Sequence, residues 1–152
     1  MRPSRRSADY GERGSASVEF LTVGMLLLVP TVYLVLTLAA VQSASFAVEG
    51  AARQASRVFV QSESLGAAQS AAATAIAVTL ADYGLDAADA RVEVTCAPDP
   101  ADCLTRRGFV TVTVSTVVPL PLLPPVLGVD APPGVPITAT STEQVSRFAG
   151  SG

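Results

Sequence analysis

The chain has 152 residues, of which 49% are apolar and 15% charged, so its length allows one small domain beside a membrane segment. Its formal net charge is −3, and no basic patch occurs beyond the N-terminus, which argues against a nucleic-acid-binding protein. It contains no histidine, no lysine and no G-x-S-x-G motif, so we expect no enzyme, no cofactor and no small-molecule substrate.

Residues 1–14 form a polar leader that we expect to be disordered. Its basic residues outnumber its two acids, and they are Arg2, Arg5, Arg6 and Arg13. The next basic residue is Arg53, far beyond the apolar run that follows the leader. By the positive-inside rule, the N-terminus lies in the cytoplasm and the residues after about 42 lie outside.

An uncharged run of 21 residues follows, from Leu21 to Val41. As a helix it is roughly 31 Å long, which matches the hydrocarbon core of a bilayer. Pro30 lies within the run, and membrane-spanning helices tolerate proline at the cost of a kink. We therefore predict one membrane-spanning helix.

The segment Gly14–Phe20, "GSASVEF", places a glutamate at the start of this span. Burying the ionised Glu19 carboxylate in a bilayer costs several kcal/mol unless the carboxylate finds a partner. The segment resembles the type IV prepilin processing signal, G-x-x-x-x-E-[FY], as found in Flp-type pilins and their pseudopilin relatives. The resemblance implies that a prepilin peptidase cuts after Gly14 and makes Ser15 the new N-terminus.

Such a cut creates an α-ammonium group at Ser15, in the same layer of the membrane as Glu19. When subunits pack side by side, this cation neutralises the Glu19 of a neighbour in a low-dielectric environment. Glu19 and the adjacent Phe20 are therefore the candidate subunit docking residues. An ordinary signal anchor with a glutamate near the interface is the alternative reading of the same segment.

A helix is predicted from about Ser17 to about Ser62, so it continues well past the span. Glu49 and Arg53 are four residues apart and can form an ion pair on its solvated side. Small residues recur at every fourth position of its outer part, a pattern that allows another helix to approach closely. These residues are Ala39, Ser43, Ala47, Ala51 and Ala55. An alanine-rich helix without such a partner is the alternative.

A second helix is predicted from Ser64 to about Tyr83, with Gly84 as its stop signal. Its apolar side chains recur at helical spacing and form one weakly apolar face. The residues of this face are Leu65, Ala68, Ala72, Ile76, Thr79 and Leu80.

After the second helix, the pattern changes to the alternation that is typical of β-strands, in "ARVEVTC" and "GFVTVTVSTVV". Cys96 and Cys103 stand at the turn between these runs. In an oxidising compartment they form a disulfide, so we predict a disulfide-pinned antiparallel hairpin. Two cysteines without histidine do not make a tetrahedral metal site, so no metal is expected.

The segment 119–136 contains too many prolines for a central strand and is predicted to be an extended or polyproline loop. The alternating segment 137–145 is predicted to be a third strand. The expected fold is thus α+β: a long N-terminal helix, a second helix and a small antiparallel sheet. Its parts are a cleaved leader (1–14), a membrane-spanning helix (15–62) and an outer domain (63–152).

Five aspartates lie near predicted helix ends and turns, where aspartate commonly caps the backbone. They are Asp82, Asp86, Asp89, Asp99 and Asp102. The segment "DAADA" lacks the glycine and the final glutamate of an EF-hand loop, so a calcium site is not expected.

The segment "EGAARQASRVF", the mixed helix and strand region and the proline-rich stretch before a last strand resemble the TadE-like family of the tight-adherence (Tad/Flp) pilus system. The resemblance implies a minor pilin or pseudopilin, because Flp major pilins have little beyond their helix. Its implied partners are the prepilin peptidase, other Tad/Flp pilins and the pilus assembly platform proteins. The implied location is the cytoplasmic membrane, with the outer domain on the far side or on a surface pilus.

Two alternatives remain. The first is a pseudopilin of a type II secretion system, which the sequence does not separate from the Tad reading. The second is an extracytoplasmic binding domain behind an ordinary signal peptide, cut after a small residue such as Ala40 or Ser45. Against the second, the apolar run exceeds the 7–15 residues that are typical of a signal peptide.

Overall fold

A computed structural model describes residues 15–119 and 134–148 of the chain. The chain divides into an N-terminal unit, Met1–Thr37, and a C-terminal unit, Leu38–Gly152. One long helix, α1, runs from Ser15 to Val60, which confirms the predicted helix to within two residues at each end. The leader lies outside the described residues, so its disorder stays a prediction.

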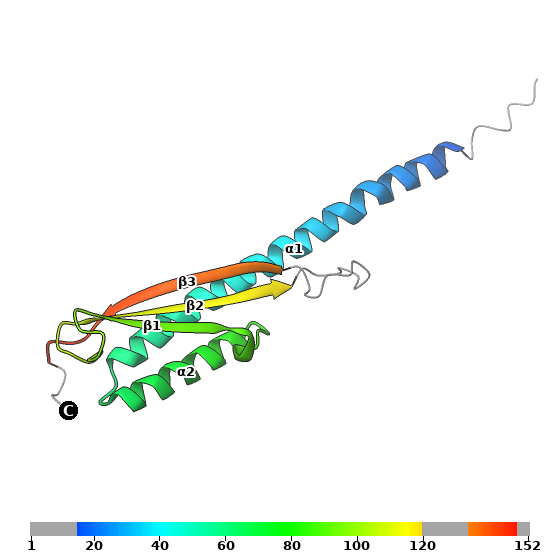
Figure 1. The fold of residues 1–152 in the computed structure, drawn as a ribbon. Helices are drawn as coiled ribbons and strands as arrows, with labels where there is room; N and C mark the ends of the chain where they lie inside the picture. Colours follow the sequence, from blue (N-terminus) through cyan, green and yellow to red (C-terminus); the bar gives the residue numbers. More distant parts are fainter. Residues whose placement is uncertain (1–14, 120–133, 149–152) are drawn as a thin grey trace, which may run out of the picture. The chain divides into compact units, whose positions relative to one another are not determined.

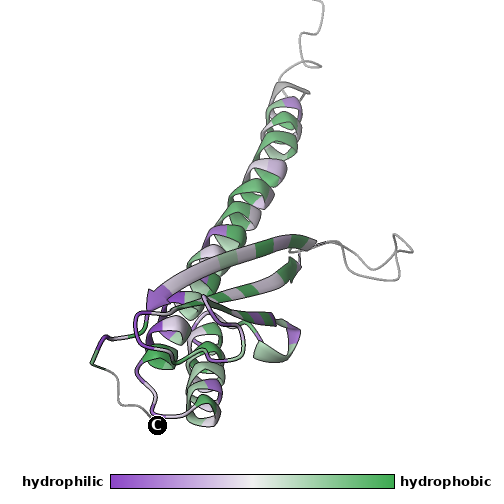
Figure 2. Cartoon of the chain, turned by 60° about the vertical axis from the view of Figure 1, so that its left-hand side comes forward, coloured by the Kyte–Doolittle hydropathy of each residue, from purple (hydrophilic) through white to green (hydrophobic). Residues whose placement is uncertain are grey.

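The described part of the N-terminal unit is the first half of α1, up to Thr37. Nearly all of its apolar side chains are exposed, from Val32 at 47% to Phe20 at 78%. Figure 2 shows how hydrophobic residues dominate this stretch of the helix. This apolar surface needs a partner other than water, because a solvated helix of this composition would be unstable.

In its described residues, the C-terminal unit contains the rest of α1 and five further elements (Figure 1). These elements are α2 (Leu65–Ala81), the short 3-10 helix η1 (Ala87–Asp89), β1 (Arg91–Ala97), β2 (Phe109–Pro119) and β3 (Gly134–Gln144). The strands form one antiparallel sheet in the order β1-β2-β3. The α+β fold expected from the sequence is confirmed.

Both ends of α2 follow from local chemistry. At its start, the Ser64 side chain accepts a hydrogen bond from the Ala67 N–H, at 3.3 Å. At its end, Gly84 has φ +71°, a conformation that glycine adopts without strain, and the Leu85 N–H donates to the Leu80 carbonyl. The predicted stop at Gly84 is confirmed.

The core forms where both helices cover the same face of the sheet. Val110, Val112 and Val114 of β2 are fully buried, as their alternation predicts. They pack with buried side chains of α1 and α2 in one cluster. From the helices this cluster includes Ala47, Val48, Ala51, Ala52, Ala55 and Phe59 of α1, and Ala68, Ala72, Ile76 and Leu80 of α2.

Two residues of the predicted α2 face are less buried than their four partners. Leu65 is 42% exposed and Thr79 is half-buried. Leu65 is the first residue of the helix, one turn before the first buried position, Ala68. The apolar face of α2 is therefore narrower than the sequence pattern suggests.

The proline-rich segment was predicted to be a loop throughout, and this is wrong at both ends. Pro119 ends β2, and β3 begins at Gly134, so Pro136 lies in a strand, opposite Val117. A strand at the edge of a sheet tolerates proline at positions where the backbone N–H would point to solvent, because no ladder hydrogen bond is lost there. The rest of that prediction, 120–133, falls outside the described residues.

Candidate subunit docking site

The candidate docking site lies at the start of α1. The helix begins at Ser15, the residue directly after Gly14. Glu19 is therefore the fifth residue of the helix, directly after its first turn, and its side chain is exposed. It has no hydrogen bond or ion pair with any residue in the described ranges. Its neighbour Phe20 is also open, at 78% exposure.

The apolar part of α1 is long enough to cross a membrane, and the most apolar stretch has no part buried inside the protein. Its threonine hydroxyls donate to carbonyl groups four residues back: Thr22 to Val18, Thr31 to Leu27 and Thr37 to Tyr33, at 2.7–2.9 Å. Such bonds satisfy hydroxyl groups without water. The helix is therefore compatible with a single membrane anchor or a signal sequence.

Sequence reasoning treated Pro30 only as a tolerated kink and did not single out Tyr33. The structure keeps Pro30 inside a continuous helix. The Tyr33 hydroxyl, unlike the threonine hydroxyls around it, has no hydrogen-bond partner among the described residues. The sequence signal that was available is a lone phenol within an uncharged apolar run.

The row of small residues divides into two parts. Ala47, Ala51 and Ala55 are fully buried in the chain's own core. Ala39 and Ser43 are exposed. Close helix approach does occur near the buried part: a Cβ placed on Gly50 would lie 3.5 Å from Cγ2 of Thr79 in α2. A second helix on Ala39 and Ser43 stays a prediction.

Two polar contacts fix the same part of α1. Glu49 and Arg53 form the predicted ion pair, with both side chains half-exposed or more. Near this pair, Ser56 is fully buried, and its Oγ donates to the Ser141 Oγ of β3 at 2.9 Å. The second contact ties the helix to the sheet and was not foreseen from the sequence.

The hairpin between β1 and β2 carries the predicted Cys96–Cys103 disulfide. Within its loop, the Asp99 and Asp102 carboxylates accept backbone N–H groups of Ala101 and Leu104, at 2.9 and 3.2 Å. They act as turn caps, as expected. In the ranges that the structure describes, no three histidine, cysteine or acidic side chains group as metal ligands would.

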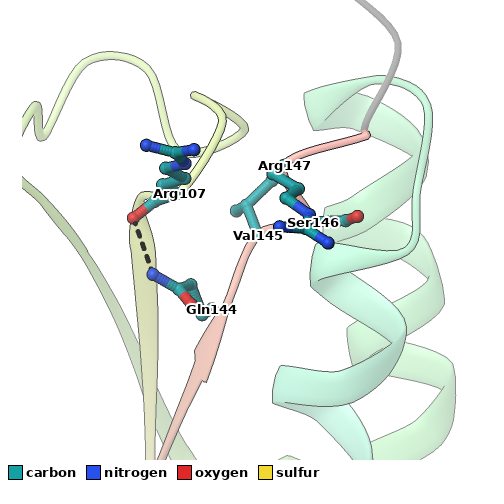
Figure 3. Close-up of a pocket in the computed structure, with 5 residues that line it drawn as sticks. All are labelled: Arg107, Gln144, Val145, Ser146 and Arg147. Carbon is teal, nitrogen blue, oxygen red and sulfur yellow. Dashed lines mark hydrogen bonds between the residues drawn. The ribbon is translucent and has the colours of Figure 1, made fainter.

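A shallow pocket of about 440 Å³ lies where β2 begins and β3 ends, lined by Arg107, Gln144, Val145, Ser146 and Arg147 (Figure 3). The Gln144 side-chain amide donates to the Arg107 carbonyl at 3.2 Å, and the Arg107 N–H donates to the Val145 carbonyl. These bonds hold the two chain segments together. Figure 3 shows the two arginine side chains extending in different directions, so they do not converge on one point.

Comparisons with protein-family models, with curated proteins and with solved structures find no match to this chain.

Proposed function

We propose that this chain is a minor pilin or pseudopilin that takes part in assembling a Flp-type, tight-adherence pilus. It is anchored in the cytoplasmic membrane by α1 and packs that helix against other pilin subunits. The observation that carries the proposal is the segment Gly14–Phe20, with its glycine, its glutamate five residues later and the apolar helix that follows at once.

The start of α1 supports cleavage after Gly14. A protease needs extended backbone at the bond it cuts, and glycine readily leaves the helix. The helix begins at Ser15, on the far side of that bond. A helix that starts directly after Gly14 supports a cut at the bond between Gly14 and Ser15.

The exposure of Glu19 supports its role in docking. A charged group at the edge of an apolar helix, without a partner within the described chain, is costly in a bilayer. The cut frees the α-amino group of Ser15, which then carries a positive charge as an ammonium group. Pairing of that group with the Glu19 of a neighbour removes the cost, and it also fixes how far the two helices are displaced along their axes.

The arginines of the leader and the disulfide support the proposed orientation. Arginines before the span keep the leader in the cytoplasm. The Cys96–Cys103 disulfide is typical of proteins in oxidising compartments, which lie on the other side of the cytoplasmic membrane. Both features therefore favour an extracytoplasmic C-terminal unit.

Two alternative functions make different demands on the same chain. A type II secretion pseudopilin would use the same segment in the same way, and gene neighbourhood would separate the two. A secreted binding domain is less favoured, because Ala40 and Ser45 both lie inside α1 and Ala44, between them, is buried in the protein. A signal peptidase would have to unwind the helix to cut there.

The test is the mature N-terminus, measured by mass spectrometry of the protein from its native membrane. We expect Ser15 as the first residue of the mature chain. Gly14→Leu should leave the full-length protein in the membrane, because leucine favours helix and adds bulk at the cut. Gly24→Leu is the matched control, since a Cβ at Gly24 meets nothing within 4 Å, and this variant should be processed normally.

A mature chain beginning after Ala40 or Ser45 would contradict the proposal and favour the secreted binding domain. A Gly14→Leu variant that is processed to the same size as the wild type would contradict it as well.

A further inference from the structure

The apolar first half of α1 holds a hydroxyl group without a partner among the described residues and a backbone carbonyl whose usual N–H donor is absent, and these two groups are complementary. The threonines there satisfy their own hydroxyls through carbonyls four residues back. Tyr33 does not do this, because its ring holds the hydroxyl away from the backbone of its own helix. Its hydroxyl is a donor without a partner among the residues that the structure describes.

The complementary acceptor is the carbonyl group of Leu26. In an α-helix this oxygen accepts from the N–H four residues later, and that residue is Pro30, which has no N–H. The Thr31 hydroxyl donates to the Leu27 carbonyl at 2.7 Å and therefore does not replace the donor that the Leu26 carbonyl lacks. In a hydrocarbon environment, a carbonyl without a donor is unfavourable.

The two groups lie on one side of the helix. Leu26 and Tyr33 are seven residues apart, which is about two helical turns. Within one chain the structure forms no bond between them. The Tyr33 hydroxyl of one chain can reach the Leu26 carbonyl of another chain when the two helices are parallel, side by side and displaced along their axes.

We propose that the Tyr33 hydroxyl of one copy donates a hydrogen bond to the Leu26 carbonyl oxygen of an adjacent copy within the membrane. This inference rests on the proposed function, because it describes how the anchors of neighbouring subunits pack. The occupant of this helix face is a second copy of the chain, since the same helix supplies both the unpaired donor and the unpaired acceptor.

The displacement that forms this bond is the one that the Glu19 contact requires. A copy displaced by four residues, about 6 Å, brings its Ser15 to the level of Glu19. The same displacement brings its Leu26 to the level of Pro30. Tyrosine side chains in helices lean toward the N-terminus, which carries the Tyr33 hydroxyl toward that level.

The helix faces also agree. At about 100° per residue, Glu19 and Tyr33 lie about 40° apart around the helix, on one face. On the second copy, Ser15 and Leu26 lie about 20° apart by the same rule. One pair of parallel helices can therefore make both contacts, the ion pair at the membrane edge and the hydrogen bond near its middle.

The test measures self-association, in phosphatidylcholine vesicles, of the chain that begins at Ser15, because the Glu19 contact needs the Ser15 ammonium group. Two populations carrying donor and acceptor fluorophores are mixed, and energy transfer is followed against the protein-to-lipid ratio. Tyr33→Phe removes only the hydroxyl, and Pro30→Ala returns an N–H to the Leu26 carbonyl. Each should weaken association by about three- to twentyfold, the range seen for hydrogen bonds between membrane helices.

The double variant decides whether the two changes act on one bond. Both single variants remove the same hydrogen bond. The self-association of the double variant should therefore equal, within about twofold, that of the single variant that associates less strongly. Tyr83→Phe is the matched control, since Tyr83 lies in the C-terminal unit, and it should associate like the wild type.

Three results would overturn the inference: Tyr33→Phe associating like the wild type, a double variant whose loss is the product of the single losses, or a wild-type chain that does not self-associate. Its failure is distinguishable from failure of the proposed function. A mature chain that begins at Ser15 beside an unaffected Tyr33→Phe variant would remove the hydrogen bond alone. A mature chain that begins elsewhere would remove the pilin proposal itself.

Discussion

At the scale of single residues, the alanines of α1 show how one sequence pattern serves two environments. Ala51 is fully buried in the core, whereas Ala39, three turns earlier in the same row, is exposed. Because Ala51 has no exposed surface, a longer side chain at this position has to displace neighbouring core atoms. At Ala39, nothing in the described chain imposes that limit.

We therefore expect Ala51→Leu to lower the free energy of unfolding by about 1–3 kcal/mol, the usual cost of overpacking a core. Ala39→Leu, the matched control, should change it by about 0.5 kcal/mol or less. Urea titration of the full chain in detergent micelles, followed by far-ultraviolet circular dichroism, measures both. Equal effects of the two substitutions would show that the row does not pack within the chain as described.

At the scale of elements, the hairpin of β1 and β2 combines two separate restraints. Its register pairs Val94 with Val112 and Cys96 with Val110, so the ladder aligns the strands. The disulfide joins Cys96, which lies within the ladder, to Cys103 in the connecting loop, and both half-buried cysteines pack against the core. The ladder acts on the folded state, and the disulfide restricts the unfolded chain as well.

Replacing both cysteines by serine should lower the free energy of unfolding by about 2–3 kcal/mol, as loop-closure entropy predicts for so short a loop. The hairpin should keep its register, because the strand pairing remains. Urea titration with and without a reductant tests this: the reductant should shift the wild-type midpoint toward that of the double variant and leave the double variant unchanged. An unaffected wild-type midpoint would mean that the disulfide adds no stability.

At the scale of the whole molecule, the two units call for different surroundings. The N-terminal half of α1 exposes its apolar side chains, and the C-terminal unit buries a core under a sheet whose outer face carries hydrogen-bonded threonines, such as Thr111 with Thr142 at 2.8 Å. The first suits lipid or other helices, and the second suits water. This difference is compatible with a single membrane anchor or a signal sequence, and the proposed pilin assembly needs the anchor.

Glu19→Gln tests that assembly. We expect the variant to insert and to be cut after Gly14, because the peptidase recognises the glycine and the apolar run. Assembly should fail, because the Ser15 ammonium keeps only a neutral amide as its partner, and breaking a buried pair from one side costs about 3–5 kcal/mol. Co-purification with other pilin-like subunits and counts of surface pili should fall, while membrane level and mature size stay constant. A fully piliated variant strain would reduce Glu19 to an interfacial residue.

The sequence by itself determined the kinds of element and their approximate bounds, because the signals for these are local. Ser64 caps α2 and Gly84 ends it, each through bonds to neighbours a few residues away. The alternation in β2 was sufficient to identify its buried valines. With two cysteines in the chain, one disulfide was the available pairing. The candidate docking residues were also found from sequence, since the motif is contiguous.

Only the tertiary structure decided which parts of these patterns are buried. It confined the buried part of the small-residue row to the alanines after Ser43. It also left Leu65 at the surface and extended β3 through Pro136 at the edge of the sheet. It also showed that Val92 and Val94 of β1 stay 44% and 39% exposed although they lie opposite buried valines. Burial depends on where a neighbouring element stops, and contacts between segments far apart in the chain set that limit, which no local spacing records.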